Sequence, residues 1–241
     1  MIPWHPQVKI IKEQADVLMV YKPCGVLSHP NKAGLCKQSL IQAPYDFSQQ
    51  AYRTSDGLIY LLNRLDSPTS GLVILCKNSV LTQQIRKLFK GHNVKKIYHA
   101  IVKGRFTGKN VCWQDKLQIE KSEQHLRTHQ TSDKGGVLAK TLVTLIQNFN
   151  FHDETLSLIQ LEPLTGRTHQ LRVQCAQHHF PILGDKTYGN FKCNRRLKVD
   201  RLFLHACSTE FTIEDQIFTG YCDSGFSEWI QTDESRKNVG S

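Results

Sequence analysis

Asp66 is the residue of this sequence whose type and position most clearly suggest chemistry. It lies two residues after Arg64, in a polar corner between the apolar runs 58–62 and 72–76. Both runs have the length and the leucine or β-branched content of strands, and a Pro and a Gly mark the irregular segment between them. A carboxylate on a loop between two buried strands is held by a rigid scaffold, which favours a catalytic role. The alternative is a turn aspartate that accepts hydrogen bonds from nearby amides, which is the commoner role.

Two further stretches add weight to the corner. A strand-like run over residues 95–104 (Lys-Lys-Ile-Tyr-His-Ala-Ile-Val-Lys-Gly) carries Tyr98. Farther on, residues 164–173 read Leu-Thr-Gly-Arg-Thr-His-Gln-Leu-Arg-Val, and residues 181–189 read Pro-Ile-Leu-Gly-Asp-Lys-Thr-Tyr-Gly. Together with the corner, these stretches resemble the catalytic motifs of the RluA-type pseudouridine synthases. The matches occur in one order and span residues 17–211, which makes the resemblance specific.

The resemblance implies an enzyme that isomerises uridine to pseudouridine in RNA. The reaction breaks the bond between ribose C1′ and uracil N1, turns the base, and joins C5 to C1′. It is redox-neutral, and the family needs neither a metal nor an organic cofactor. A carboxylate suits the task because it is charged at neutral pH and can stabilise or attack an electron-poor carbon. By resemblance, Asp66 is the nucleophile.

Arg172 and Tyr98 complete the catalytic set that the resemblance implies. Arg172 matches the basic residue that pairs with the catalytic Asp, and a cation within ~4–6 Å favours the ionised carboxylate. Its alternative role is a phosphate or surface arginine, and the spacing does not require it to be buried with its neighbour Leu171. Tyr98 matches the tyrosine whose ring packs against the target base and whose phenol can transfer a proton at the sugar. Its alternative role is core packing.

The same resemblance predicts RNA contacts. Arg64 matches the arginine that enters the RNA stack in place of the flipped nucleotide, a role for which a planar cation is suited. The residues expected to shape the pocket floor and hold the RNA backbone are Arg167, Thr168, His169 and Gln170. Two positions depart from the family pattern, since Asn63 and Gln174 stand where the family has His. We expect these departures to affect RNA contacts and target choice.

Composition fits an RNA-binding protein. The chain has 241 residues, with 31 Lys and Arg against 21 Asp and Glu, and a formal charge of +10 suits a polyanionic partner. No apolar run approaches the ~20 residues of a membrane-spanning helix. The N-terminus does not read as a secretion signal, and the eight cysteines are scattered without a Cys-x-x-Cys pair. We therefore expect reduced thiols and a monomeric, cytoplasmic protein.

Hydrophobic patterning predicts an α+β fold, a mixed and largely antiparallel sheet with flanking helices. A catalytic domain is expected over residues 1–230, followed by a frayed tail over 231–241. Helices are predicted from Ser79 to about Gly91 and over 168–178, with a helical turn near 39–43. Strands are predicted over 8–11, 17–21, 97–102, 141–146, 155–161, 202–206 and 209–213, with a surface hairpin within 107–136. The sequence shows no S4-like RNA-binding module before the first catalytic-domain strand.

Other functions fit less well. His125 and His129 have a spacing that could share a metal, and Cys175 lies near His178, but we interpret the first as chance and the second as packing. His29 is interpreted as a loop contact. The sequence lacks the Gly-x-x-x-x-Gly-Lys-Ser/Thr phosphate-binding loop of nucleotide hydrolases. It also lacks the Gly-x-Ser-x-Gly nucleophile elbow of serine hydrolases.

The serious alternative is a catalytically silent, synthase-like RNA-binding protein or RNA chaperone. The joint presence of Asp66, Tyr98 and Arg172 favours the enzyme, because a protein that only holds RNA does not need that set. Its substrate is expected to be tRNA or rRNA. The missing S4-like module and the 95–104 segment favour the smaller, tRNA-modifying branch of the family.

Overall fold

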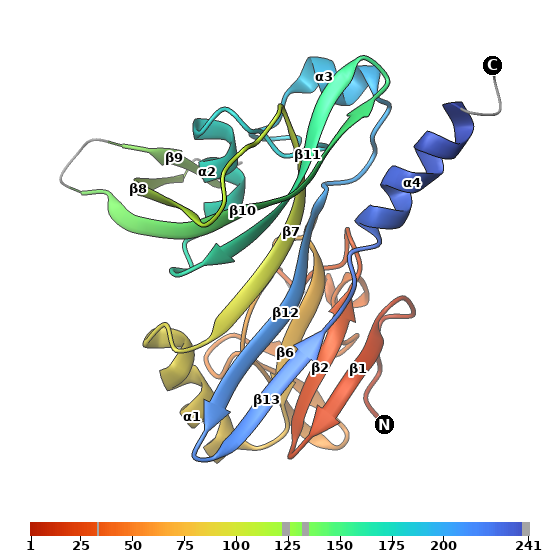
Figure 1. Ribbon diagram of the computed structural model, residues 1–241. Coiled ribbons are helices and arrows are strands. Elements are labelled where there is room, and N and C mark those ends of the chain that lie inside the picture. The colour runs from red at the N-terminus through yellow and green to blue at the C-terminus, as the bar shows by residue number, and fades with distance from the viewer. Residues whose placement is uncertain (33, 122–125, 132–134, 238–241) are drawn as a thin grey trace. The chain divides into compact units, whose positions relative to one another are not determined.

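The computed structural model describes residues 1–32, 34–121, 126–131 and 135–237. The chain forms two compact units. Unit 1 comprises Met1–Lys96 and Ala206–Asp223, and unit 2 comprises Ile97–His205 and Ser224–Ser241. Two strands, β7 (Lys95–Lys103) and β12 (Leu204–Ile213), contribute residues to both units (Figure 1).

Unit 1 is built on antiparallel strand pairs. The order runs β1 (Lys9–Gln14), β2 (Val17–Lys22), β6 (Ser70–Cys76), β5 (Gly57–Leu61), β4 (Ala51–Thr54) and β3 (Tyr45–Asp46). In addition, β13 (Gln216–Tyr221) pairs with β12. The predicted pairing of the first two strands and the two strands around the Asp66 corner are confirmed. Short β4 and β13 were not predicted, and the predicted helical turn near 39–43 lies instead at η1 (Cys36–Gln38).

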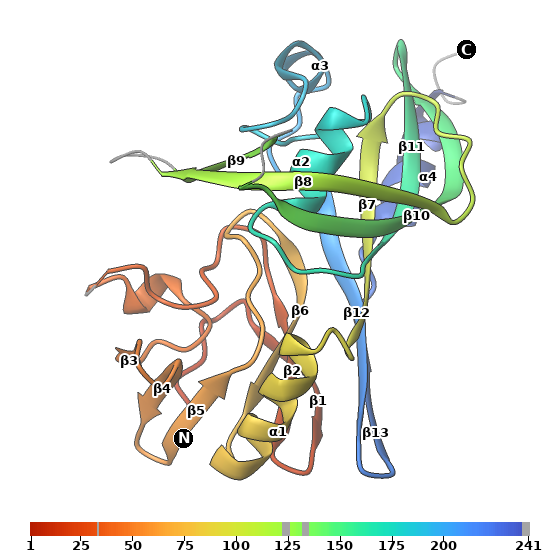
Figure 2. The same cartoon turned by 90° about the vertical axis from the view of Figure 1, so that its left-hand side faces the viewer.

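Helix α1 (Ser79–Lys90) begins and ends as its sequence predicts. The Asn78 side chain accepts hydrogen bonds from the amides of Val80 and Leu81 at 2.9 and 3.1 Å, and Gly91 is the C-terminal cap. Such an N-cap satisfies amides that the first turn leaves without partners. Ile85 on the apolar stripe is fully buried in a cluster with side chains from β2, β6, β12 and β13. The helix therefore covers one face of the unit 1 strands (Figure 2).

Unit 2 is a second set of antiparallel strands, in the order β7, β11 (Glu154–Pro163), β10 (Val137–Phe151), β8 (Val111–Lys121) and β9 (Leu126–Gln130). The predicted pair around residue 150 and the predicted hairpin within 107–136 are confirmed. Strands β10 and β11 are longer than the predicted 141–146 and 155–161, and the hairpin lies inside the predicted range. His125, which has metal-sharing spacing to His129, lies outside the described residues.

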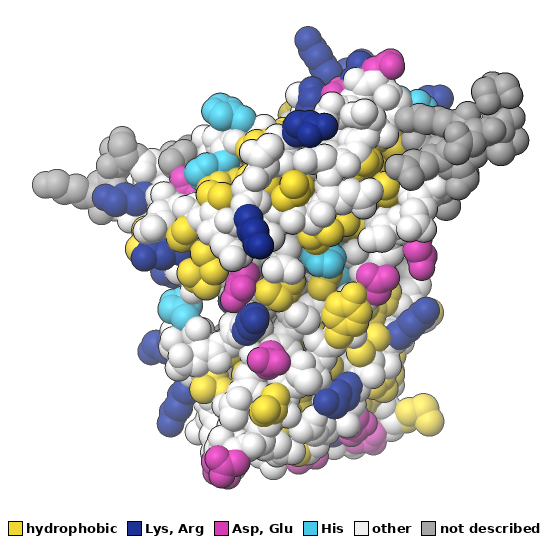
Figure 3. All heavy atoms as spheres, in the orientation of Figure 1, with side chains coloured by type: hydrophobic (Ala, Val, Ile, Leu, Met, Phe, Trp, Pro, Cys, Tyr) yellow, Lys and Arg dark blue, Asp and Glu magenta, His cyan; other side chains and the backbone are white. Residues whose placement is uncertain are grey.

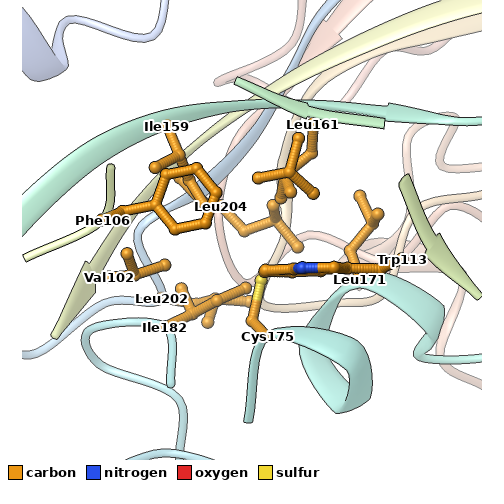
Figure 4. Close-up of a cluster of buried hydrophobic side chains, with 12 residues drawn as sticks. Val102, Phe106, Trp113, Ile159, Leu161, Leu171, Cys175, Ile182, Leu202 and Leu204 are labelled. Atoms are coloured by element: carbon orange, nitrogen blue, oxygen red, sulfur yellow. The ribbon is translucent and has the colours of Figure 1, made fainter. Parts of the chain in front are cut away.

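Helix α2 (Gln170–Gln177) packs on the unit 2 strands. Leu171 and Cys175 point from the helix into a buried cluster with Val102, Ile159 and Trp113, as Figure 4 shows. This confirms the apolar face predicted for the helix. The strands predicted over 202–206 and 209–213 are one continuous strand, β12.

Two helices of unit 2 were not predicted: α3 (Phe191–Arg196) and α4 (Phe226–Lys237). Phe226 and Ile230 of α4 are buried against Phe203. The predicted frayed tail is therefore helical up to Lys237, while residues 238–241 lie outside the described part of the chain. The reason is that Phe226 and Ile230, at i and i+4, are buried and Trp229 stacks on Phe151, so three large side chains anchor the helix.

The predicted α+β class with largely antiparallel pairing is confirmed. In the described residues, no helix combines the length and apolar character needed to cross a bilayer. On the face drawn in Figure 3, Lys and Arg side chains are interspersed with acidic ones. The positive excess of the sequence therefore does not by itself locate an RNA-binding surface on that face.

Candidate active site

The Asp66 corner of unit 1 is clamped by backbone and side-chain hydrogen bonds. Ser28 Oγ donates to the carbonyl oxygen of Leu65 at 2.9 Å and accepts from its amide at 3.0 Å. The Gly25 amide donates to the carbonyl oxygen of Ser67 at 2.8 Å, and the Thr69 amide donates to that of Asp66 at 3.0 Å. Leu65 is buried, Asp66 is half-buried and Arg64 is exposed. The corner thus presents a carboxylate and a guanidinium from a fixed backbone.

Lys22 lies beneath this corner and is completely buried. Its ammonium donates to three backbone carbonyl oxygens at 2.7–3.0 Å, those of Val26, Pro23 and Ser67. Burial lowers the pKa of Lys22 to about 8, and electrostatic interactions with Cys24 and Asp66 oppose part of that shift. The ammonium is therefore mostly charged at neutral pH, and it holds two chain segments on either side of the corner together.

Arg64 contacts a loop histidine. Its Nη1 lies 3.2 Å from His29 Nε2, and His29 Nδ1 lies 3.0 Å from the carbonyl oxygen of Pro30. A carbonyl oxygen only accepts, so Nδ1 carries the proton and Nε2 accepts from Arg64. The loop contact predicted for His29 thus orients the arginine of the corner.

Tyr98 lies on β7 in unit 2, opposite Leu161 of β11. It is half-buried and packs against the cluster drawn in Figure 4. The ring thereby takes its position from the core of unit 2. Both sequence interpretations, core packing and active-site tyrosine, involve a ring held in this way.

Arg172 forms a buried ion pair with Asp185. Its Nε and Nη2 donate to the two carboxylate oxygens at 2.7 and 2.9 Å, and the side chains are only 6% and 1% exposed. Arg172 is buried like its neighbour Leu171, because this bidentate partner compensates its charge inside the unit. Burial acts to raise the pKa of Asp185, but Arg172 and the amides of Thr187 and Tyr188 outweigh it and hold that pKa below its usual value.

Gln170 is buried at 4% exposure, and internal hydrogen bonds occupy its amide. Its oxygen accepts from Thr165 Oγ1 at 2.8 Å and from the Arg167 amide at 3.0 Å. Its nitrogen donates to the Lys140 carbonyl and to Thr141 Oγ1, both at 3.0 Å. The predicted direct contact with RNA is not compatible with this burial. Gln170 instead fixes the loop that leads into α2.

The neighbouring predicted RNA contacts are more accessible. His169 has a left-handed backbone (φ +54°), and its Nδ1 lies 2.8 Å from the Tyr188 hydroxyl, which also accepts from the Thr128 amide. Arg167 is exposed and donates from Nε to a backbone carbonyl of β10 at 3.2 Å. Thr168 is half-buried. Arg167, Thr168 and His169 therefore form one short surface segment of unit 2.

The two departures from the family pattern have internal roles. Asn63 accepts from the Ile74 amide at 2.7 Å, which extends the pairing between the corner and β6. Gln174 is fully buried, accepts from Thr141 Oγ1 at 2.6 Å and donates to Asp115 Oδ2 at 2.7 Å. A direct effect of Gln174 on RNA contacts is excluded by its burial.

The Cys175–His178 cluster weighed from the sequence does not form a metal site among the described residues, and His125 lies outside them. In that part of the chain no group of three or more His, Cys, Asp or Glu side chains could hold a metal ion. Cys175 is buried, which raises the pKa of its thiol well above the usual value. His178 stacks on Trp113 at 4.3 Å and lies 3.1 Å from Asp115 Oδ2, which supports the packing interpretation.

A family model described as RNA pseudouridylate synthase matches residues 16–177, more than half of the chain. The chain belongs to this family. The members are isomerases that act on RNA, so the resemblance stated from the motifs is confirmed. The matched region of this synthase includes the Asp66 corner, Tyr98 and Arg172.

Curated relatives agree with the family assignment. The synthase is 31% identical over 223 residues to ribosomal large subunit pseudouridine synthase D of Borreliella burgdorferi, covering 90% of this chain and 64% of that one. It is 28% identical over 214 residues to tRNA pseudouridine synthase C of Vibrio cholerae, covering 85% of each chain. The chain thus spans less than two thirds of the first of these relatives.

Solved structures support the fold. Human RNA pseudouridylate synthase domain containing 1 superposes with a TM-score of 0.73 at 24% identity, covering 91% of this chain and 84% of that one. Human RNA pseudouridylate synthase domain containing 4 gives a TM-score of 0.67 at 18% identity. At these identities the likeness establishes the fold alone.

Sequence reasoning assigned no role to Lys22 or Asp185. Asp185 lies in the 181–189 stretch, which follows the stretch that carries Arg172. An acidic residue in one motif and a basic residue in the next were the signal for their pairing. Lys22 directly follows the strand predicted over residues 17–21. Its signal was a lone lysine directly after the apolar run 17–21.

Proposed function

We propose that this synthase converts uridine to pseudouridine in RNA with Asp66 as the nucleophile. The observation that carries this assignment is the clamped corner: a half-buried carboxylate on a loop fixed by Lys22 and Ser28, within the family-matched region. Partial exposure leaves the carboxylate within reach of a ribose, and the fixed backbone limits its reorganisation. Both properties are needed for a charged group that acts on C1′.

The remaining roles are those that the family resemblance implies. Tyr98 packs against the target base and offers a phenol oxygen for proton transfer at the sugar. By resemblance, Arg172 pairs with the nucleophile and favours its ionised form. Its bidentate contact with Asp185 fixes the orientation of the guanidinium. Arg64 takes the place of the extruded nucleotide in the RNA stack. The base loses the proton on C5 and gains one on N1, so no oxidant or reductant is required.

The proposed substrate is tRNA. Support comes from the relative named tRNA pseudouridine synthase C, which is 28% identical to this chain over 214 residues, and from the 95–104 segment. We further propose that the protein acts as a monomer in the cytoplasm. Arg167, Thr168 and His169, on one surface segment of unit 2, are proposed to hold the RNA backbone.

Asp66→Asn tests the assignment. The variant keeps the size of the side chain but removes the charge, so pseudouridine formation should be abolished while RNA affinity stays within a few fold. Pseudouridines are mapped by carbodiimide-primer extension in tRNA and rRNA from cells with and without the gene, then after complementation with each variant. Asp215→Asn, an exposed carboxylate of unit 1, is the matched control and should restore every site.

The same experiment separates the enzyme from a silent RNA-binding protein. A silent protein predicts identical pseudouridine maps with and without the gene. Normal modification by Asp66→Asn would refute the nucleophile assignment. A site that appears only in rRNA would refute the tRNA proposal and leave the activity intact.

A further inference from the structure

An aromatic cluster lies next to Arg64 in unit 1, outside the residues that the family motifs assign. The rings of His29 and Tyr45 stack at 4.9 Å with an interplanar angle of 14°. The Phe47 ring stands nearly perpendicular to both, with centroids at 5.9 and 5.2 Å. Burial raises the pKa of the Tyr45 phenol, and the charges of Arg64 and Arg86 oppose that rise. A guanidinium and three rings thus share one surface, here called the aromatic platform (His29, Tyr45, Phe47 and Arg64).

Phe47 is 57% exposed although it is one of the largest apolar side chains. It occupies the tip of the turn between β3 and β4, and that turn is tightly held. Asp46 accepts from Ser48 Oγ at 2.6 Å, from the Ser48 amide at 2.9 Å and from the Gln49 amide at 3.1 Å. It also pairs with Arg53. The Ser48 hydroxyl first, then the Gln49 amide, lower the pKa of Asp46 to about 2.

Arg86 of α1 fixes the same turn from the other side. Its Nη2 donates to the carbonyl oxygen of Gln49 at 2.8 Å, and its guanidinium lies 5.8 Å from the centroid of the Tyr60 ring. The turn that carries Phe47 is therefore anchored to both β4 and α1. A ring presented on a fixed turn loses little conformational entropy when it binds, which is the property of a binding anchor.

The platform is also tied to the corner that carries Asp66. His29 accepts from Arg64 at 3.2 Å, and its neighbour Ser28 makes two hydrogen bonds with the Leu65 backbone. A ligand that stacks on the platform rings is therefore held at a fixed distance from Arg64. An enzyme that extrudes one nucleotide could bind the next nucleotide of the same RNA strand at that distance.

We propose that the aromatic platform binds an unpaired RNA base that flanks the target uridine, stacked on Phe47 beside Arg64. Surfaces that hold single-stranded nucleic acid combine aromatic rings with positive charge, as this one does. The inference rests on the proposed function, because it assigns a second subsite for the same RNA. A second copy of this chain is a less suitable occupant, since Arg64 on one platform would face Arg64 on the other.

Phe47→Ala tests the platform, and Phe191→Ala is its matched control. Phe191 is also 57% exposed, but it begins α3 in unit 2, far along the chain from the corner. The probe is a fluorescein-labelled oligouridylate at fixed ionic strength, with an RNA duplex of equal length for comparison. Loss of one stacked base should weaken oligouridylate binding by about tenfold in Phe47→Ala. Phe191→Ala should bind like the wild type, and duplex affinity should not change in either variant.

Phe47→Trp gives an independent readout. It should keep wild-type affinity, and its added indole fluorescence should be quenched as oligouridylate binds. Equal affinities of Phe47→Ala and wild type, or equal losses in Phe47→Ala and Phe191→Ala, would overturn the platform. Loss of self-association in sedimentation without loss of oligouridylate binding would overturn it in favour of a dimer surface.

These outcomes are distinct from failure of the proposed function. If Phe47→Ala modifies RNA in cells with unchanged efficiency and binds oligouridylate normally, the platform fails and the synthase assignment stands. If the pseudouridine maps do not depend on the gene while oligouridylate binding depends on Phe47, the activity fails and the platform stands as an RNA-binding surface.

Discussion

Replacing Asp185 by Asn removes the charge that neutralises Arg172 inside unit 2. The two side chains are 1% and 6% exposed and share two hydrogen bonds at 2.7 and 2.9 Å, so the arginine cannot turn to water without disturbing the packing of α2. Removing one partner of a buried ion pair costs about 3–5 kcal/mol, because the other charge stays desolvated. We expect the free energy of unfolding of Asp185→Asn to fall by about 4 kcal/mol.

Urea unfolding monitored by circular dichroism measures this loss. The slope m should be the same for the variant and the wild type, which shows that both undergo the same unfolding transition. In a thermal scan it corresponds to a fall in Tm of about 8–16 °C, at ~2–4 °C per kcal/mol for a chain of this size. Glu13→Gln is the control, because Glu13 pairs with Lys77 at an exposed site. Exposed ion pairs contribute ~0–1 kcal/mol, so the control should be nearly silent.

The pH dependence gives a second check of the same pair. The pKa of Asp185 is depressed in the folded chain, so the unfolded state binds more protons as the pH falls below the ordinary Asp value of 3.8. The stability that Asp185 contributes is fully present above that value and is lost as the pH falls through the folded pKa. The difference between wild type and Asp185→Asn should therefore narrow in acid.

A double variant makes the reasoning refutable. Arg172→Met in the Asp185→Asn background removes the uncompensated charge, and it should recover part of the lost stability. If Asp185→Asn lies within about 1 kcal/mol of wild type, or if the double variant is less stable than the single one, the buried pair does not stabilise unit 2 as argued.

Three further substitutions have defined outcomes. Lys22→Met should lower the free energy of unfolding by at least about 2 kcal/mol in urea, because buried carbonyls lose their donor. It should also abolish the rise in wild-type stability between pH 8 and 10.5, where the unfolded chain binds the extra proton; an unchanged pH profile would contradict this. Gly71→Ala should lower the free energy of unfolding by more than about 3 kcal/mol, because at φ +121° the added Cβ would lie 2.3 Å from the Ala206 carbonyl oxygen. A thermal scan measures the loss, and a wild-type Tm would refute that clash. Gln174→Leu should lower the free energy of unfolding by about 1–3 kcal/mol, because Asp115 loses one hydrogen-bond donor. RNA affinity in a binding titration should not change, and weaker RNA binding would support the role in RNA contacts expected from the sequence.

Local signals made much of unit 1 predictable. The strands around Asp66 are apolar runs with a Pro and a Gly between them, and α1 carries an Asn cap, one apolar stripe and a terminal Gly. These features act over a few residues, so a single sequence contains them. Strands β4 and β13 were missed because they are only four and six residues long and carry few buried apolar side chains, namely Ala51, Tyr52 and Phe218. Helix α4 was missed because its hydrophobic face is narrow, with Phe226 and Ile230 as its buried anchors.

The site was predictable in residue identity but not in partners. The motifs indicated Arg172, yet its burial depends on Asp185, thirteen residues farther along the chain. No periodicity reports such a pair, because the charge of one side chain is compensated only once the 181–189 segment folds over α2. Gln174 shows the same limit, since a polar residue in a motif was interpreted as a contact for RNA and is instead an internal donor to Asp115.

Two buried charges hold the proposed catalytic groups in different ways. Lys22 is satisfied by neutral carbonyl oxygens, so its role is to fix the backbone on both sides of the Asp66 corner. Arg172 is satisfied by a carboxylate, so its role depends on charge, and Asp185 is needed to keep a cation inside unit 2. Each unit thus orients its own group through contacts within that unit, before any RNA binds. Preorganised charges do not have to reorient as the reaction proceeds, and that property makes an ionised carboxylate effective against a sugar carbon.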